Sequence, residues 1–391
     1  YNRQNDQSAA IQLLEQHIKH LNTMPDLAQQ LITLYIRTNK ANKAEQLIAA
    51  LRLQYPDNAE FAILHAAVLK QLSRPTQAQQ VVDSYAQQYG TTALISTNQA
   101  LTALENNDLP QAMRLVDQLL LQAPDNSGYL NFKAAVLIKQ QQYAAAKTLL
   151  HSILQRDPKY QAAQFNLARI ALTENAIDTA VALLEPIVAS KNGYKPAPTL
   201  LAAAYIKAGK MAEAETLLRD VSAVTPYPPA DELLFDLYLE QQNYAAALLL
   251  VNKGLERAFL NETLLWKKAQ LLKLLKRNDE ASYNTELLSS IVQHDADKLL
   301  RLAMLQRELA QYPASERSLL VAHSIKPDAK IIKLELVNHY LLTETVKQAE
   351  HWLQRLKPLT TKDANVQMLH GDVALMQGNN QLAIAWYQRA L

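Results

Sequence analysis

Residues 105–158 read ENNDLPQAMRLVDQLLLQAPDNSGYLNFKAAVLIKQQQYAAAKTLLHSILQRDP, and the rest of the chain repeats the pattern of this stretch. Ala112 and Ala146 are 34 residues apart, and so are Pro124 and Pro158. The interval continues in both directions, with a shortening by one residue before Ala247. Alanine occupies eleven of the twelve positions, which are Ala10, Ala44, Ala78, Ala112, Ala146, Ala180, Ala214, Ala247, Ala281, Ser315, Ala349 and Ala383. A fixed period of this kind predicts a repeat array.

The period resembles that of the tetratricopeptide repeat, in which two antiparallel helices form each unit. Units are predicted to begin at Pro25, Ala59, Ala93, Ser127, Gln161, Lys195, Pro228, Glu262, Ala296, Lys330 and Ala364. The small residue that the family places eighth in each unit corresponds to Ile32, Ala66, Ala100, Ala134, Ala168, Ala202, Phe235, Ala269, Ala303, Val337 and Gly371. The resemblance implies an all-α fold, a right-handed superhelical α-solenoid of about eleven helix pairs plus an N-terminal half repeat.

Residues 1–391 are interpreted as a single solenoid, with a sub-array junction near 226–229, where prolines cluster and the period shortens. Ser8 to Leu21 matches the second helix of a unit, and so does Gln381 to Leu391. Neither end carries a polar capping helix, so we expect a fragment of a longer array whose uncapped ends can self-associate.

The composition favours helix and argues against several classes of protein. Nearly half of the 391 residues are apolar and only seven are glycine, which is costly inside helices. No apolar run approaches the length of about 18 residues that a transmembrane helix needs. The 39 basic and 37 acidic residues are interspersed, so no basic stripe predicts a nucleic-acid partner. Cysteine is absent, which excludes disulfides and thiol chemistry.

No motif in the chain predicts catalysis, a cofactor or a metal. The nine histidines form no His-Glu-x-x-His motif, and the nearest pair, His17 and His20, lies on a largely polar segment typical of a solvated helix face. Phosphate-binding glycine loops and nucleophile elbows are missing as well. We therefore expect a protein that is not an enzyme.

The remaining candidate is the concave groove, which in the resembled family is lined by positions two, five, nine, twelve and thirteen of the first helices. The resemblance places in it Asn131, Lys139, Phe165, Arg169, Lys207, Glu232, Asp236, Trp266 and Gln270. The earlier members are mainly basic and the later ones acidic, a sign change that would hold a protein or peptide ligand in one direction. Phe165 and Trp266 are expected either as exposed anchors or as side chains buried between units.

A solenoid without catalytic, cofactor-binding or metal-binding motifs indicates a protein-interaction scaffold. The stretches FNLARIAL (165–172), ALLEP (182–186) and GDVALMQG (371–378) are similar to bacterial tetratricopeptide lipoproteins of PEP-CTERM/exosortase systems and to periplasmic arms of exopolysaccharide exporters. That resemblance implies an envelope or periplasmic assembly. Two alternatives remain, a docking arm of an enzyme whose catalytic domain lies outside this chain, and a cytoplasmic peptide-binding adaptor. Direct polysaccharide binding through Trp266, Tyr205 and Tyr238 is a further hypothesis.

Overall fold

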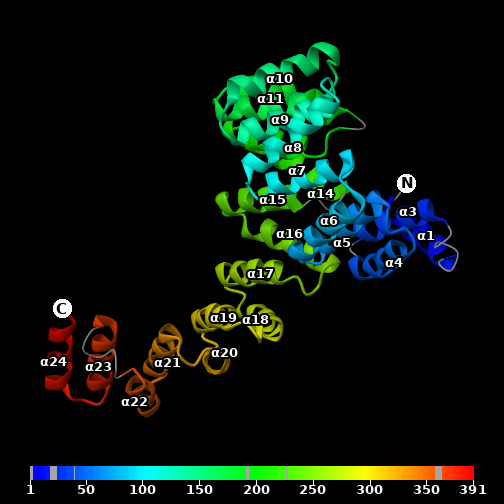
Figure 1. The fold of residues 1–391 in the computed structure, drawn as a ribbon. Helices are drawn as coiled ribbons and strands as arrows, with labels where there is room; N and C mark the ends of the chain where they lie inside the picture. Colours follow the sequence, from blue (N-terminus) through cyan, green and yellow to red (C-terminus); the bar gives the residue numbers. More distant parts are fainter. Residues whose placement is uncertain (1–2, 18–23, 39, 191–192, 225–227, 357–362) are drawn as a thin grey trace. The chain divides into compact units, whose positions relative to one another are not determined.

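The computed structural model describes residues 3–17, 24–38, 40–190, 193–224, 228–356 and 363–391. These residues form 23 α-helices that pack in consecutive pairs (Figure 1). The chain divides into two compact units, which are Tyr1–Ala214 and Glu215–Leu391.

The first unit opens with α1 (Arg3–Gln16). Its helix pairs are α3 (Pro25–Arg37) with α4 (Ala41–Gln54), α5 (Ala59–Gln71) with α6 (Pro75–Tyr89), α7 (Ala93–Glu105) with α8 (Leu109–Gln122), α9 (Ser127–Lys139) with α10 (Tyr143–Arg156), and α11 (Gln161–Thr173) with α12 (Ile177–Ala189). α13 (Ala197–Lys207) follows, and the boundary between the units falls within α14 (Met211–Val224).

The second unit continues the same order. Its pairs are α15 (Pro228–Glu240) with α16 (Tyr244–Arg257), α17 (Glu262–Leu274) with α18 (Asn278–Val292), α19 (Ala296–Glu308) with α20 (Tyr312–Ile325), α21 (Lys330–Leu342) with α22 (Val346–Gln354), and α23 (Ala364–Met376) with α24 (Asn380–Ala390). From α3 onward, odd-numbered helices are the first helices of the repeats and even-numbered helices are the second.

The first helices begin at the predicted residues with one exception, α13, which begins at Ala197 rather than Lys195. Pro196 immediately precedes this helix and shortens it. The N-terminal helix spans Arg3–Gln16 rather than Ser8 to Leu21, so that prediction was wrong in its bounds, and residues 18–21 lie outside the described residues. The junction predicted near 226–229 also falls partly outside them.

The repeated alanines are buried where the two helices of a pair meet. Ala44, Ala78, Ala112, Ala146 and Ala180 are all fully buried, and their equivalents from Ala214 to Ala383 are at most 1% exposed. The eighth position of each first helix is buried as well, with Phe235 as its largest member at 7% exposed. Alanine at nearly every twentieth position, and alanine or glycine at most of the eighth positions, let the helices approach closely, which is the role that the period predicts.

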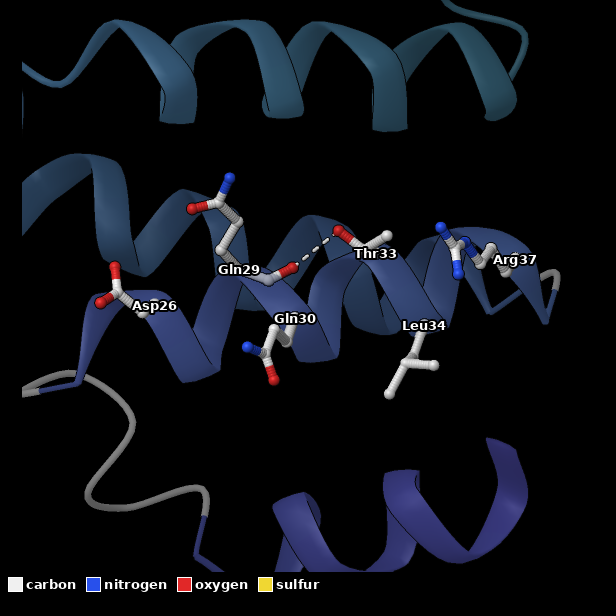
Figure 2. A pocket seen from close by; sticks show the side chains of 6 residues that line it. All are labelled: Asp26, Gln29, Gln30, Thr33, Leu34 and Arg37. Atoms are coloured by element: carbon white, nitrogen blue, oxygen red, sulfur yellow. Dashed lines mark hydrogen bonds between the residues drawn. The ribbon is translucent and has the colours of Figure 1, made fainter. Parts of the chain in front are cut away.

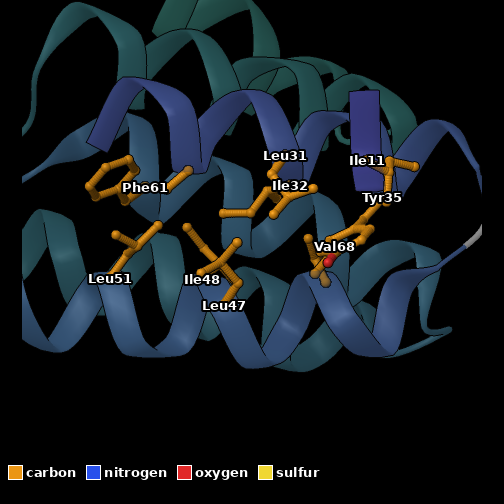
Figure 3. Close-up of a cluster of buried hydrophobic side chains, with 11 residues drawn as sticks. Ile11, Leu31, Ile32, Tyr35, Leu47, Ile48, Leu51, Phe61 and Val68 are labelled. Carbon is orange, nitrogen blue, oxygen red and sulfur yellow. The ribbon is translucent and has the colours of Figure 1, made fainter. Parts of the chain in front are cut away.

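Larger apolar residues around these positions form the core. In one cluster (Figure 3), α1, α3, α4 and α5 together bury the side chains of Ile11, Leu31, Ile32, Tyr35, Leu47, Ile48, Leu51, Phe61 and Val68. Each helix pair therefore completes its core with side chains of its neighbours, which is why successive repeats stack.

In the described turns between paired helices, a residue with left-handed backbone conformation follows the C-terminal end of the first helix. These residues are Ser73, Asn107, Gln141, Asn175, Gly209, Gln242, Lys276, Ala310, Glu344 and Gly378, with φ between 55° and 76°. In the second of these turns, the Asp108 amide donates to the Ala103 carbonyl at 2.8 Å and the Asn107 amide donates to Leu104 at 3.2 Å. This is the Schellman arrangement, which satisfies the last helical carbonyls and reverses the chain.

Tyrosines at the eleventh position link a first helix to the second helix before it. The hydroxyls of Tyr35 and Tyr205 donate to Glu15 and Glu185 at 2.8 and 2.9 Å. The Tyr340 hydroxyl in the second unit donates to Glu316 at 2.6 Å. Burial and then the neighbouring carboxylate raise the pKa of these phenols, so they remain neutral donors.

Candidate functional site

The candidate site is the inner face of the first helices, by which we mean positions two, five, nine, twelve and thirteen together with the residues beside them. At about 100° per residue these five positions fall within an arc of about 100°, so they share one helix face. The chemistry of this face differs from helix to helix.

A pocket of about 500 Å³ lies on the inner face of α3 (Figure 2). Its lining residues come from this single helix and are Asp26, Gln29, Gln30, Thr33, Leu34 and Arg37. Leu34 also packs against the core cluster of Figure 3, which anchors the pocket to the folded interior. The polar side chains of α3 are therefore presented from a rigid element.

Most of the polar side chains in this pocket make no hydrogen bond or ion pair with other described residues. The Thr33 hydroxyl donates to the Gln29 carbonyl of its own helix at 2.8 Å. Within the described part of the chain, no hydrogen bond or ion pair engages the side chains of Asp26, Gln29, Gln30 or Arg37. Asp26 lies in the first turn and Arg37 in the last, positions that also suit the helix dipole. The pocket thus has two amides, both without a partner among the residues that the structure describes, between an anionic end and a cationic end.

Two of the predicted groove residues, Asn131 on α9 and Arg169 on α11, meet through a third residue. The Asn166 amide donates to Asn131 Oδ1 at 2.9 Å, and Arg169 Nη1 donates to Asn166 Oδ1 at 3.3 Å. Asn166 is 5% exposed, so its hydrogen bonds hold the two flanking side chains in place. No acidic side chain pairs with Arg169 among the described residues.

Lys139 and Lys207 are exposed but bind within the chain. Each ammonium donates to a carbonyl at the end of the preceding first helix, Leu104 at 3.0 Å and Leu172 at 3.3 Å. Cations at a helix C-terminus interact favourably with its unpaired carbonyls. These lysines join neighbouring repeats, and their role toward a partner stays a prediction.

Phe165 is half-buried, and its ring lies 5.0 Å from that of Tyr194. Tyr194 precedes α13 and is 36% exposed, so the pair offers a small aromatic surface at this edge of the inner face. Tyr194 was not predicted as a site residue, because it lies outside the helical register that the prediction used.

The remaining predicted residues lie in the second unit. Glu232 forms an ion pair with Lys267, whose ammonium also lies 4.1 Å from the centroid of the Phe235 ring. Asp236 and Gln270 are exposed.

Trp266 was expected either as an exposed anchor or as a buried side chain. It is buried, so the expectation of an exposed anchor was wrong. It is 6% exposed, and the Arg301 guanidinium covers its ring at 4.4 Å. Tyr238 is also 6% exposed. Neither residue offers a free ring face to a sugar, so the aromatic surface expected for polysaccharide binding is missing there.

The residues of the α3 pocket were missed, although the rule that selects the inner face applies to them. Asp26, Gln29, Thr33 and Arg37 occupy positions two, five, nine and thirteen of the first complete repeat. The prediction examined only the middle and later repeats. What the sequence does not show is that these side chains lack partners, because that depends on which residues the neighbouring helices bring close.

Two further searches cover the described residues only. They contain no group of three or more His, Asp or Glu side chains arranged to hold a metal ion. None of their helices combines the length and the apolar content needed to cross a membrane.

Comparison with known proteins gives one family. The tetratricopeptide-repeat family model matches residues 2–68, 137–193 and 171–234. No curated protein matches the chain. Among solved structures, a tetratricopeptide repeat protein from Parabacteroides merdae is 16% identical, with a TM-score of 0.45, and the match covers 63% of this chain and 98% of that one. The human IFIT1 dimer with PPP-AAAA is 14% identical, with a TM-score of 0.44 and coverages of 97% and 94%.

The family match, the 34-residue period and the pairing of helices through buried residues at the eighth and twentieth positions agree with one another. The chain therefore carries tetratricopeptide repeats over the residues that the family model matches, and the other described helices pair in the same way.

Proposed function

We propose that this protein is a non-catalytic scaffold that holds an extended segment of a partner protein against the inner face of its first unit. The observation that carries the proposal is the pocket on α3, where the side chains of Asp26, Gln29, Gln30 and Arg37 have no partner among the described residues and line a space of about 500 Å³. Tetratricopeptide-repeat proteins generally serve as protein-interaction scaffolds, which supports the same class of function.

The two glutamines support an extended peptide as the ligand. A peptide in extended form exposes backbone N–H and C=O groups that need partners when they leave water. Each of Gln29 and Gln30 has a primary amide that both donates and accepts. From Asp26 to Arg37 the helix rises about 16 Å, which matches roughly five extended residues.

The two charged ends support one orientation of that peptide. Arg37 can bind a carboxylate with two parallel hydrogen bonds, and Asp26 attracts a basic group at the other end. We therefore expect a segment with an acidic residue near Arg37 and a basic residue near Asp26, about five positions apart.

Fluorescence polarisation with labelled, end-capped peptides tests this proposal. One set places an acidic and a basic residue at the two ends of a five-residue core, and a neutral set replaces both. Arg37→Glu should weaken binding of the charged set by about tenfold, as expected for the loss of a charge-assisted contact. Arg257→Glu, at the end of α16, is the matched control and should bind like the wild type.

Two results would oppose the proposal. Equal binding of the charged and neutral peptide sets would show that Asp26 and Arg37 do not select a peptide by its charges. Weakening by Arg257→Glu as large as that by Arg37→Glu would show a nonspecific response to net charge. An Asp26→Lys/Arg37→Glu exchange that prefers peptides of reversed charge order would support the orientation directly.

We further propose a bacterial envelope assembly, such as exopolysaccharide export or protein sorting, as the setting of this scaffold. This rests on the stretches at 165–172, 182–186 and 371–378 alone. Fractionation of the source cells tests it, because recovery of the protein only in the cytoplasmic fraction would favour the adaptor alternative.

A further inference from the structure

Four basic side chains surround Trp352 in the second unit, and we call them the Trp352 cluster. They are His323 on α20, Lys333 on α21, His351 on α22 and Arg355 directly after α22. The Arg355 guanidinium lies over the indole ring, 4.6 Å from its centroid. The imidazoles of His323 and His351 stand nearly perpendicular to the indole, with centroids 4.7 and 5.8 Å away. The cluster therefore gathers side chains from three helices around one tryptophan that is 7% exposed.

The two permanent cations of the cluster are not neutralised by carboxylates. Among the described residues, neither Lys333 nor Arg355 forms an ion pair. Glu350, the acidic residue nearest along α22, accepts a hydrogen bond from Gln377 on α23 at 3.4 Å. Asp328, on the loop before α21, forms no ion pair in the described part of the chain either. The cluster thus presents a net positive charge.

The two histidines lie within the influence of these cations. Arg355 Nη1 donates a hydrogen bond to His351 Nε2. His323 Nδ1 is buried and has no hydrogen-bond partner among the residues that the structure describes. Burial lowers the pKa of His323, and the charges of Lys333 and Arg355 lower it further, while Asp328 acts in the opposite direction. Both cations therefore act on the same imidazole from α21 and from the end of α22.

We infer that the Trp352 cluster binds a phosphate group. A guanidinium such as that of Arg355 can bind two phosphate oxygens with parallel hydrogen bonds, and the Lys333 ammonium adds a compact positive charge. Like charges held close together repel each other, and an anion between them removes this repulsion. A carboxylate supplies one negative charge, whereas a phosphate supplies up to two and so matches two permanent cations.

The next repeat provides a matched comparison within the chain. Trp386 and Arg389 follow Trp352 and Arg355 by 34 residues, and the Arg389 guanidinium lies 4.8 Å from the Trp386 centroid. The counterparts of the other cluster members, in the order His323, Lys333 and His351, are Lys357, Gln367 and Ala385. Lys357 lies outside the described residues. The arginine over a tryptophan therefore recurs in both repeats, and the lysine on the first helix distinguishes the Trp352 cluster.

Tryptophan fluorescence of the whole chain, titrated with inorganic phosphate at constant ionic strength, tests the inference. Chloride is the reference anion. A phosphate bound to Arg355 changes the charge beside the indole ring, so the emission should change and saturate. Lys333→Gln is the main site variant because it keeps the contact between Arg355 and Trp352, and Arg355→Gln is the second. Arg389→Gln is the matched control, and circular-dichroism melting in chloride shows whether each variant is folded.

The wild type is expected to show a saturable response to phosphate and a higher melting temperature in phosphate than in chloride, because a ligand of the folded state stabilises it. Each site variant should bind about tenfold more weakly, as for the loss of one charge-assisted contact, and Arg389→Gln should bind like the wild type. A wild-type response no larger than that to chloride would overturn the inference. Unchanged affinity in Lys333→Gln would also overturn it, and so would equal weakening by Arg389→Gln.

Two further ligands identify the source of the phosphate group, and binding of either supports the site when Lys333→Gln weakens it. Glycerol 3-phosphate represents a soluble phosphate monoester. Mixed vesicles of phosphatidylcholine and phosphatidic acid represent a lipid headgroup, with pure phosphatidylcholine vesicles as the reference in co-sedimentation. Arg37→Glu should leave phosphate binding unchanged, so the result is independent of the α3 pocket and of the function proposed for it.

Discussion

The Ser315 hydroxyl donates a hydrogen bond to the main-chain carbonyl of Ala303, 2.7 Å away, and so connects the twentieth position of a repeat with the eighth. Ser315 is the one non-alanine among the repeated alanines, and it is 1% exposed. Most buried hydroxyls in folded proteins have a hydrogen-bond partner, because an unpaired one lowers stability. This bond explains the exception and shows how closely the two helices approach at this level.

Ala146→Leu should lower the free energy of unfolding by about 1–3 kcal/mol, because the added carbons have no space at a fully buried helix contact. Ala145→Leu, one residue away and exposed, is the matched control and should change stability by less than about 0.5 kcal/mol. Chemical denaturation followed by circular dichroism measures both. Similar losses for the two variants would contradict the role of the twentieth position.

Ala310→Gly should stabilise the protein by about 0.5–1 kcal/mol. Ala310 has a φ of 58°, a left-handed conformation that strains an L side chain and is easy for glycine. Gly209 occupies the same turn position with a φ of 75°, and nothing lies within 4 Å of where its Cβ would be. Gly209→Ala should therefore destabilise through backbone strain alone, and thermal melts of opposite sign for the two variants are the expected outcome.

Gly371→Ala should destabilise the last repeat by about 1–3 kcal/mol, although alanine is common at the eighth position of other repeats. A Cβ on Gly371 would overlap the ring of Tyr387, which is held by its hydrogen bond to Asp372. Adding Tyr387→Leu should recover part of the loss because leucine leaves space there. If the double variant is less stable than the sum of the single variants predicts, the ring is not the cause.

Acidification below the ordinary histidine pKa of about 6.5 should destabilise the protein. Burial lowers the pKa of His339, which is 1% exposed, and also that of His65 and His323. The unfolded chain therefore binds protons at a pH where the folded chain does not, and the free energy of unfolding falls as the pH drops through this range.

The melting temperature of the wild type should be lower at pH 5 than at pH 7.5. His339→Leu should reduce this difference, whatever its effect on stability at neutral pH. His294→Leu, at an exposed position on the loop after α18, is the control and should preserve the difference. An unchanged difference in His339→Leu would mean that this imidazole does not drive the acid response.

The sequence by itself determined the repeat, the residues at which first helices begin, and the buried small positions. It could do so because a helix pair cannot bury its apolar face alone, so each repeat must meet its neighbours with the same residues. The spacing of Ala112 and Ala146 therefore carries tertiary information. α13 departs from this regularity, since Pro196 acts locally and shortens it.

Only the tertiary structure decided which inner-face side chains are available to a partner. Trp266 and Gln29 occupy the same position of their repeats, yet Arg301 covers the buried tryptophan and the glutamine lines an open pocket. Lys139 and Arg37 are likewise equivalent, but the lysine donates to the Leu104 carbonyl of the neighbouring helix. The periodic sequence assigns each residue to a face, whereas its freedom depends on the side chains that adjacent helices bring within reach.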